Sequence, residues 1–448
     1  MTQCVEQLHL GILHGKRVTG GFDGGDISSD GGLMLVAAAD ARLGLTRQLA
    51  ACLHDRRDPN KVTHQLHELL AQRVYQIAAG YEDCNDADDL RHDPVLKTAV
   101  GRLPQSDPDL GSQPTLSRFE NAVTRRELWG LAQVLVEQFL ARHADRRPKY
   151  LVLDFDATDD ETHGQQQFAE FHGFYDEHCY LPLIVTAQVD GGPQELLVAL
   201  LRRGRSHASR GALAVLKRLV ARLRQQWPGL PLLVRGDSGF AIPALYDWCE
   251  AQDVPVWYLI GLAQNARLRA LAGPHLQRAR AEYEWTGEKV RRLHAARYAA
   301  KPWPHRRRVL IKAEVAAKGD NPRFVVTNLR GRAAGLYDLY AARGEMENRI
   351  KELKCDLQMD RTSCHRFAAN QFRVLLHAAA FVLCGALREA LAGTELAQAQ
   401  VGTLQRQLLK LGVRAKETAR RVWLQFASSC PVKDLWPVVL ARLKPVAA

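Results

Sequence analysis

The order of strand-like and helix-like segments between residues 150 and 266 constrains this 448-residue chain most. Three apolar, strand-like runs come first, and a helix, a strand, a helix and a strand follow, which gives the order βββαβαβ. Connections between the first three runs permit antiparallel pairing. We therefore predict one mixed sheet with helices on its faces. The segments read YLVLDFDA, CYLPLIVTAQVD, QELLVALLRRG, GALAVLKRLVARLRQQ, LPLLVRGD, ALYDWCEAQ and VPVWYLIGLA.

This order is that of a ribonuclease H-like fold, and we predict an α/β protein of that kind. In such a fold the first strand lies beside the fourth, so Asp156 and Asp237, which end these strands, would be neighbours. Alternation along the first strand puts Asp154 and Asp156 on one face. We favour Asp156 as the functional residue because it is nearer the strand end. Asp154 would then support it, or be a buried, hydrogen-bonded acid.

A polar helix face is predicted between residues 340 and 354. A carboxylate on that face could hold a divalent metal while the cations beside it bind phosphates. Apolar residues of the same period would bury the adjoining flank. A solvated face explains most such spacings, but the two strand-end aspartates favour a metal site of three carboxylates. The polar residues are Tyr340, Arg343, Glu347 and Lys354, and the apolar ones are Met346, Ile350 and Leu353.

The charge balance and the cysteines narrow the partners and the compartment. A formal net charge of +12 favours a polyanionic partner, and nucleic acid is the first candidate. Nine cysteines without a CxxC pair indicate a reducing compartment and argue against a zinc module. The N-terminus lacks the pattern of a secretory signal. The longest apolar run, residues 374–387, is interrupted by His377 and is too short to span a membrane, so we expect a buried helix in a cytoplasmic protein.

Several basic and aromatic residues are candidates for nucleic-acid contact. Residues 267–332 contain short β-like runs, of which the first, EYEWTGEKVRRLHAARYAA, starts near residue 282. Cations interleaved with tryptophans suit strand tracking and base stacking, although a solvated sheet with a tryptophan core fits as well. A second basic set follows the third strand and could line a DNA path or have no function. The first set is Lys289, Arg291, Arg292, Arg306, Arg307 and Arg308 with Trp285 and Trp303, and the second is Arg202, Arg203, Arg205 and Arg210.

Candidates in the N-terminal block are weaker. His64 and His67 lie one helical turn apart, but without a third ligand we prefer solvated or core histidines. The acidic stretch GYEDCNDADDLRHDP lacks a calcium-loop spacing and could cap helices. In SQPTLSRFEN a helix N-terminus could contact a DNA phosphate. An ordinary capped helix without a ligand explains this sequence equally well. The basic stretch KLGVRAKETARRVWLQFASS near the C-terminus could touch DNA or keep the surface soluble.

Together these motifs resemble those of bacterial insertion-sequence transposases of the DDE type, in the group with a Tyr-x2-Arg-x3-Glu-x6-Lys signature. Here the signature is YAARGEMENRIKELK, with all four residues in register. The blocks LDFDATDD and VRGDSGFA resemble the two aspartate motifs. The resemblance covers roughly residues 150–392.

This resemblance implies a metal-dependent phosphoryl transfer. Asp156, Asp237 and Glu347 would be the catalytic residues and would bind two Mg²⁺ ions, for which Mn²⁺ can substitute. The signature residues Tyr340, Arg343 and Lys354 would contact DNA phosphates near the scissile end. An aromatic residue would stack on a flipped base, and the candidates are Trp257, Trp285 and Trp303.

We therefore expect a DNA transposase that binds terminal inverted repeats, cleaves the ends and transfers 3′-hydroxyls to target DNA. Its partners would be double-stranded transposon ends and target DNA, bound by a homodimer or larger oligomer, without a membrane, in the nucleoid-associated cytoplasm. A metal-dependent nuclease of the same fold and a catalytically silent DNA-binding descendant are the alternatives.

Five parts follow from these assignments. We expect a mainly helical DNA-binding region over residues 1–148 and a catalytic core over 149–266. A β-rich insertion over 267–332 would precede the rest of the core, 333–392, which carries the Glu347 helix. Residues 393–448 form the C-terminal region.

Overall fold

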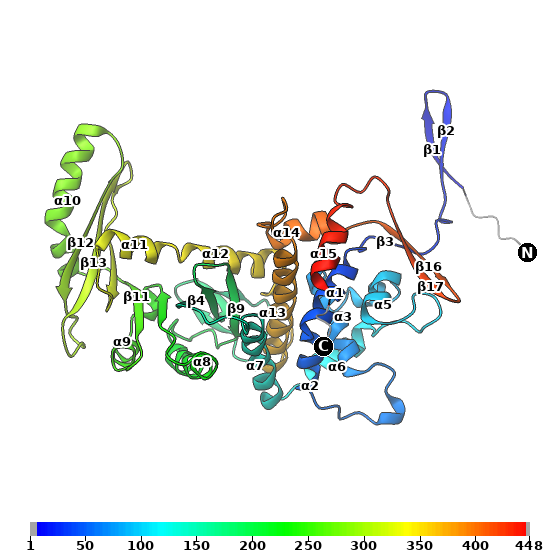
Figure 1. Cartoon of the computed structure of the whole chain (residues 1–448), viewed down its shortest axis with the longest axis horizontal. Coiled ribbons are helices and arrows are strands. Elements are labelled where there is room, and N and C mark those ends of the chain that lie inside the picture. The colour runs from blue at the N-terminus through cyan, green and yellow to red at the C-terminus, as the bar shows by residue number, and fades with distance from the viewer. Residues whose placement is uncertain (1–6, 445–448) are drawn as a thin grey trace, which may run out of the picture. The chain divides into compact units, whose positions relative to one another are not determined.

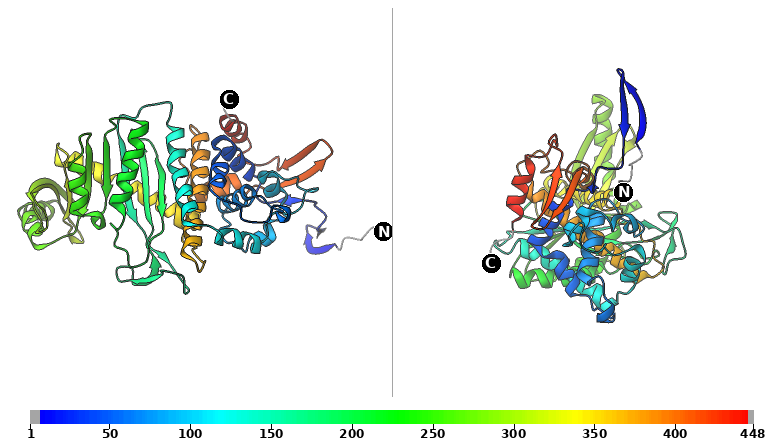
Figure 2. Two further views of the ribbon diagram at one scale, coloured as in Figure 1. Left: turned by 90° about the horizontal axis from the view of Figure 1, so that it is seen from below. Right: turned by 90° about the vertical axis from the view of Figure 1, so that its right-hand side faces the viewer.

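The computed structural model describes residues 7–444, and the chain forms two compact units (Figures 1 and 2). The first unit comprises the chain up to Glu127, Asp356–Met359, and everything from Ala379 on. The second comprises Leu128–Cys355 and Asp360–Ala378. The division into five parts stays a prediction.

A mixed sheet organises the second unit, so the predicted α/β class is confirmed. Within residues 128–378, all of them described, the strand order is β12-β13-β15-β11-β10-β4-β8-β9, with β14 paired to β13. β4 runs parallel to β10 and antiparallel to β8, so the first strand lies beside the fourth as predicted. The strands are β4 (Leu151–Ala157), β8 (Leu183–Val189), β9 (Gln194–Leu200), β10 (Leu232–Gly236), β11 (Val256–Leu262), β12 (Val290–Tyr298), β13 (Arg307–Ala316), β14 (Gly319–Asp320) and β15 (Arg323–Thr327).

The two faces of this sheet have different cores. Leu151, Leu153 and Phe155 of β4 join the larger core with residues of four helices. Val152 joins a smaller core on the opposite face, where α11 (Ala333–Ala341) packs. Because side chains alternate along a strand, Asp154 and Asp156 share the face of Val152 and α11. The four helices of the larger core are α7 (Arg125–Arg142), α8 (Ala212–Gln226), α9 (Pro243–Glu250) and α10 (Ala266–Thr286).

The segment before α11 differs from its prediction. The β-like interpretation of Glu282–Thr286 was wrong, because α10 includes these residues and ends at Gly287, whose φ of 72° suits glycine. A long preceding run of Ala, Leu and Arg favours helix and carries it through the aromatic residues. The strands β12, β13 and β15 that follow extend the central sheet beyond β11.

The predicted signature helix is interrupted. α11 ends at Ala341, residues 342–343 form a turn, and α12 (Gly344–Lys351) follows. α12 continues into the π-helical segment η3 (Glu352–Asp356). A glycine at position 344 is a weak helix former, and the backbone at the turn nevertheless stays right-handed. Burial of the apolar flank is as predicted, with Met346, Ile350 and Leu353 buried.

The second unit also contains a small three-stranded sheet and the first half of a long helix, whose residues from Ala379 on belong to the first unit. The small sheet lies between β4 and β8 in the sequence, in the order β5-β7-β6. Among the described residues one helix, α13 (Phe367–Ala390), is long and apolar enough to cross a membrane, but 89% of its most apolar window is buried inside the protein. The small strands are β5 (Asp160–Glu161), β6 (Glu170–His172) and β7 (Glu177–Tyr180).

Helices dominate the first unit, but residues 8–20, expected to be part of a mostly helical region, form an exposed β-hairpin. In the acidic stretch Asp93 caps the helix α5 (Pro94–Val100) through the backbone N–H groups of Val95 and Leu96, so the expected capping is observed. β16 pairs with both β17 and β3, so C-terminal strands complete a sheet begun near residue 27. The elements are β1 (Leu8–Leu13), β2 (Lys16–Gly20), β3 (Ile27–Ser28), α1 (Leu33–Leu43), α2 (Leu45–Ala51), η1 (Pro59–Lys61), α3 (Leu66–Ala78), α4 (Ala87–Leu90), α5 (Pro94–Val100), α6 (Gln113–Asn121), α14 (Val401–Leu404), η4 (Gln405–Leu409), β16 (Val413–Thr418), β17 (Arg421–Phe426) and α15 (Leu435–Leu443).

Candidate active site

Two aspartates meet at the carboxyl ends of neighbouring parallel strands. In the β4–β10 register Phe155 is opposite Gly236, so the next residues, Asp156 and Asp237, lie at the same level. Both follow the alternation that points toward α11. The Asp237 side chain also accepts a hydrogen bond from Gly239 N at 2.9 Å, which starts a short 3₁₀ turn. The prediction that these aspartates are neighbours therefore agrees with the strand register.

Asp154, the other aspartate on this face of β4, is held by a different set of groups. Its carboxylate receives two hydrogen bonds of 2.6 Å from the Arg235 guanidinium and one of 2.7 Å from Gln194. The side chains of Asp154 and Arg235 are each 1% exposed. Burial raises the pKa of Asp154, while the Arg235 hydrogen bonds and charge lower it. Asp154 is thus a buried, hydrogen-bonded acid that ties β4 to β10.

Asp156 has a perturbed carboxylate. Burial raises its pKa to about 6, and the negative charges of Asp237 and Glu347 add to this effect. The Arg343 guanidinium, 2.8 Å from Asp156 Oδ2, acts in the opposite direction. A site in which three acids repel one another while a single cation compensates has a surplus of negative charge. Such a site favours an additional cation.

Arg343 links Asp156 to Glu347. Its Nη1 lies 3.4 Å from Glu347 Oε1, and its own side chain is only 11% exposed. The Glu347 side chain is 60% exposed, so this acid is accessible to solvent. The guanidinium therefore lies between two of the three predicted metal-binding carboxylates, where it neutralises both.

Tyr340 packs against the third of the neighbouring parallel strands. In the β10–β11 register Gly236 is opposite Ile260, so Gly261 lies level with Asp237. A Cβ atom on Gly261 would be 2.9 Å from the Tyr340 hydroxyl, which is closer than Cβ atoms approach. The glycine thus lets α11 lie close to the strand end that carries the aspartates.

Lys354 is held by a fourth acid that the sequence had not singled out. Its ammonium donates to the Asp159 carboxylate and to the Asp159 carbonyl, both at 3.0 Å. Lys354 is 21% exposed and Asp159 is 30% exposed, so both remain reachable from solvent. The acid-rich sequence LDFDATDD was a signal for this residue, but its partner could not be read from spacing.

The carboxylates at this edge are suitable ligands for a metal ion, although the structure does not bring all three within coordination distance of one point. Among residues 7–444 no three His, Cys, Asp or Glu side chains lie close enough together to hold one. The oxygen donors of Asp156, Asp237 and Glu347 are those that Mg²⁺ prefers. Since Arg343 lies between two of these acids, a metal ion would have to take over its electrostatic role.

Other sequence candidates divide into buried and exposed groups. Of the three tryptophans, Trp285 is 87% exposed. Trp303 packs against Tyr246 and Tyr298, and Trp257 packs against the smaller core.

Many cations proposed to track DNA are engaged with protein groups instead. Arg202 is 7% exposed and donates to the carbonyls of Leu181 and Ala208. Within residues 267–332, most of the basic candidates form ion pairs or donate hydrogen bonds to backbone carbonyls. The ion pairs are Lys289–Glu314, Arg291–Asp338, Arg292–Glu282 and Arg307 with Asp247 and Glu250, and Arg308 donates to the carbonyls of Leu329 and Gly331.

The N-terminal histidines have protein partners. His64 lies within hydrogen-bond range of Arg102 and 3.6 Å from Glu68, and His67 contacts the Thr46 hydroxyl. These contacts agree with the expectation that both histidines are solvated or core residues rather than metal ligands.

Comparison with known proteins identifies a protein family for this chain. A family profile described as "Transposase DDE domain group 1" matches residues 10–448. No curated protein sequence matches the chain. Among solved structures the chain is similar to a piggyBac transposase synaptic complex with hairpin DNA, at 11% identity and a TM-score of 0.43, over 85% of this chain and 79% of that one. This likeness is too distant to carry an argument.

Proposed function

The chain belongs to the transposase DDE domain family, and on this basis we propose that it is the transposase of a bacterial insertion sequence. It binds the terminal inverted repeats, cleaves the ends and transfers 3′-hydroxyls to target DNA. One observation supports this most: Asp156 and Asp237 lie level on one face of the sheet, and Arg343 links Asp156 to Glu347. The strand order β9-β8-β4-β10-β11 also supports a ribonuclease H-like core.

Asp156, Asp237 and Glu347 are proposed to hold two Mg²⁺ ions, with Mn²⁺ as a substitute. When bound, such ions activate the attacking oxygen and stabilise the leaving oxygen in an in-line phosphoryl displacement. The exposed Glu347 on α12 can approach the two aspartates by a change in its own side chain. Arg343 would then exchange carboxylate for phosphate, because its guanidinium binds either group through the same paired N–H donors.

DNA contacts are proposed for the remaining signature residues. Tyr340 and Lys354 border the strand ends, and Asp159 holds the Lys354 ammonium near the site. Trp285, exposed at the end of α10, is the aromatic residue that we propose to stack on an unpaired base. Since two transposon ends have to be joined to one target, we also propose a homodimer or larger oligomer on DNA.

The test incubates purified protein and Mg²⁺ with DNA that carries the terminal repeats and a target plasmid. Wild type is compared with Asp237→Asn and with Asp253→Asn, a matched change at an exposed loop position. Nicked, excised and joined products are resolved on gels. We expect joined products from wild type and from Asp253→Asn, and none from Asp237→Asn.

Other outcomes identify other functions. Cleavage without joined products would make the protein a metal-dependent nuclease. Repeats that are bound but never cut, by any of the three proteins, would indicate a DNA-binding descendant without catalysis. Equal activity of wild type and Asp237→Asn would overturn the site assignment.

A further inference from the structure

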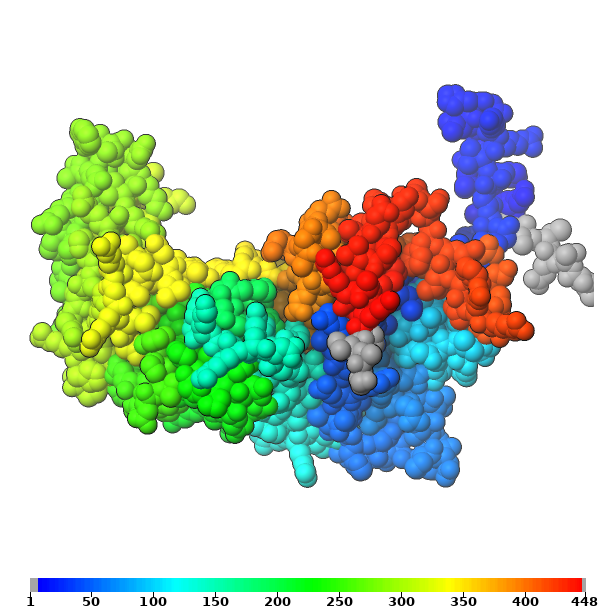
Figure 3. Space-filling view, viewed as in Figure 1, coloured from blue at the N-terminus to red at the C-terminus, as the bar shows by residue number. Residues whose placement is uncertain are grey.

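The ribbon formed by β16 and β17 has one cationic outer face. Residues that pair across antiparallel strands lie on the same face, and the pairs here alternate with inward pairs that are apolar except for Glu417. The ribbon lies at the surface of the first unit, in orange-red at the right of Figure 3. The outer pairs are Arg414 with Gln425, Lys416 with Trp423, and Thr418 with Arg421.

These cations are not neutralised within the protein. In the part of the chain that the structure describes, Arg414, Lys416, Arg420 and Arg421 form no ion pair with a carboxylate. The cations of the insertion differ, because acids hold most of those. Positive side chains that are not paired with carboxylates can bind DNA phosphates. Each such contact releases a counterion that was condensed on the DNA.

A tryptophan lies in the middle of this face. The Trp423 side chain is 50% exposed, opposite Lys416. The Arg421 guanidinium lies 5.7 Å from the centre of its ring, which orients both groups. A large exposed aromatic flanked by cations is typical of a surface that contacts sugars and bases between phosphates.

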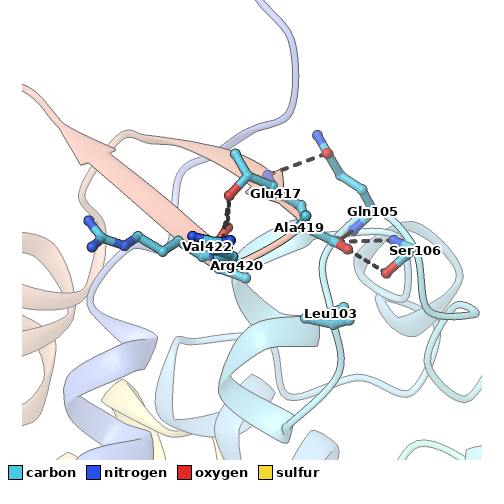
Figure 4. Close-up of a pocket in the computed structure, with 9 residues that line it drawn as sticks. Leu103, Gln105, Ser106, Glu417, Ala419, Arg420 and Val422 are labelled. Atoms are coloured by element: carbon cyan, nitrogen blue, oxygen red, sulfur yellow. Dashed lines mark hydrogen bonds between the residues drawn. The ribbon is translucent and has the colours of Figure 1, made fainter.

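Contacts beneath the ribbon fix its position. Val413 and Ala415 are buried, and the Glu417 carboxylate accepts hydrogen bonds from the backbone N–H groups of Gln105 and Ser106 at 2.9 and 3.1 Å. A groove beside these contacts is lined by Leu103, Gln105, Ser106 and residues 417–422 (Figure 4). Because the inner face is already engaged, the outer face is presented in a fixed orientation, which lowers the entropic cost of binding.

We propose that this outer face, the ribbon face of Arg414, Lys416, Arg421 and Trp423, binds double-stranded DNA. The major groove of B-DNA admits a two-stranded β-ribbon, and the cations would then meet the phosphates along its edges. The proposal rests on the proposed function for the identity of the ligand. It does not depend on Asp156, Asp237 or Glu347, so binding and catalysis can be tested separately.

The test measures the affinity of the full-length chain for a fluorescent duplex of the terminal repeat in EDTA, so that no strand is cut. Lys416→Ala with Arg421→Ala should weaken binding about 10-fold at 0.1 M salt and reduce the slope of log K against log salt by about two. The control combines Lys61→Ala with Lys433→Ala, which removes the same charge from exposed positions elsewhere. Trp423→Ala should weaken binding about 5- to 10-fold and leave the salt slope unchanged.

Equal affinity and equal salt slopes for the ribbon and control variants would overturn the proposal. A loss seen only with single-stranded DNA or with RNA would overturn the assignment to duplex DNA. Thermal unfolding of each variant within about 3 °C of wild type, on the scale at which about 1 kcal/mol shifts Tm, excludes misfolding as the cause.

The two proposals fail in different ways. If wild type cuts and joins DNA but the ribbon variants bind normally, the ribbon proposal fails alone. If wild type never cuts while the ribbon variants lose affinity, the transposase mechanism fails and the ribbon face stands.

Discussion

At the scale of single residues, Glu347 is the exposed member of the three carboxylates. Glu347→Gln should reduce cleavage at least about 10³-fold while end binding changes less than about 2-fold, because it removes a metal-binding charge at little cost in volume. Single-turnover cleavage and duplex affinity are the measurements. Glu345→Gln, on the same helix and paired with Arg349, is the control and should retain activity. Full activity of Glu347→Gln would contradict the assignment.

The buried pair of Asp154 and Arg235 gives a prediction about stability. Asp154→Asn should lower the free energy of unfolding by about 3–5 kcal/mol, because it leaves the Arg235 charge buried without its carboxylate. Urea unfolding checks this. Asp320→Asn, which breaks the solvent-exposed pair with Arg280, should cost far less, because water screens that pair. Similar losses in both variants would show that burial is not the cause.

Strand alternation was enough to predict that Asp154 and Asp156 share one face of β4. The choice of Asp156 over Asp154 follows from position along β4, and the structure adds that Asp154 is engaged by Arg235. Two contacts could not be predicted, Arg343 to Asp156 and Lys354 to Asp159. Spacing gives the face of a helix but not the distance between that helix and a strand, which depends on packing.

At the scale of elements, Gly261 determines how closely α11 approaches β11. Gly261→Ala should lower stability by about 1–3 kcal/mol and reduce cleavage, because the added methyl group would meet Tyr340 and the backbone of Asp237 and Ser238. Gly273→Ala is the control, since nothing lies within 4 Å and it is helical. That change should be neutral or stabilising by up to about 1 kcal/mol. Unfolding curves and single-turnover rates of both variants decide the matter.

Glu314 on β13 gives a prediction about pH. Burial alone would raise its pKa, but hydrogen bonds from Lys312, Lys289 and Asn321 lower the pKa to about 2. A lowered folded-state pKa means stability that is present above the ordinary value of 4.5 and is lost as pH falls toward 2. Glu314→Gln should therefore cost about 2–3 kcal/mol at pH 7.

Denaturant midpoints at pH 7, 5, 4 and 3 test this pH dependence. The gap between wild type and Glu314→Gln should be constant above about pH 5.5 and should narrow below pH 4.5. A gap that does not change with pH would mean that the carboxylate charge is not its cause.

Elements were predictable where the local pattern and the final packing agree. The order of β4, β8, β9, β10 and β11 followed from apolar runs and the helices between them. The exact end of α10 could not be predicted, because Tyr283 and Trp285 favour a strand by local propensity although the helix continues through them. The turn before α12 could not be predicted either, because a single turn changes few contacts. Extension of the sheet by β12, β13 and β15 depends on pairing between distant segments.

At the scale of the whole molecule, the first unit contains both ends of the chain. β3 needs β16 as its partner, and the backbone N–H groups of Gly31 and Gly32 donate to Leu411 and Leu409. A fragment of residues 1–127 should therefore show no cooperative thermal unfolding, and adding residues 379–448 as a separate chain should restore it. Calorimetry of the fragment, the pair and the full chain provides the test. Cooperative unfolding of the fragment alone would contradict it.

This arrangement has a consequence for biosynthesis. A ribosome releases the residues of β3 long before it makes β16, so β3 stays without its partner until residues 413–418 have been made. The sheet that carries Asp156 and Asp237 can form earlier, since all its strands are made by residue 327. A messenger cut short between the codons for α12 and those for β16 would thus yield chains with all three carboxylates but without a ribbon face.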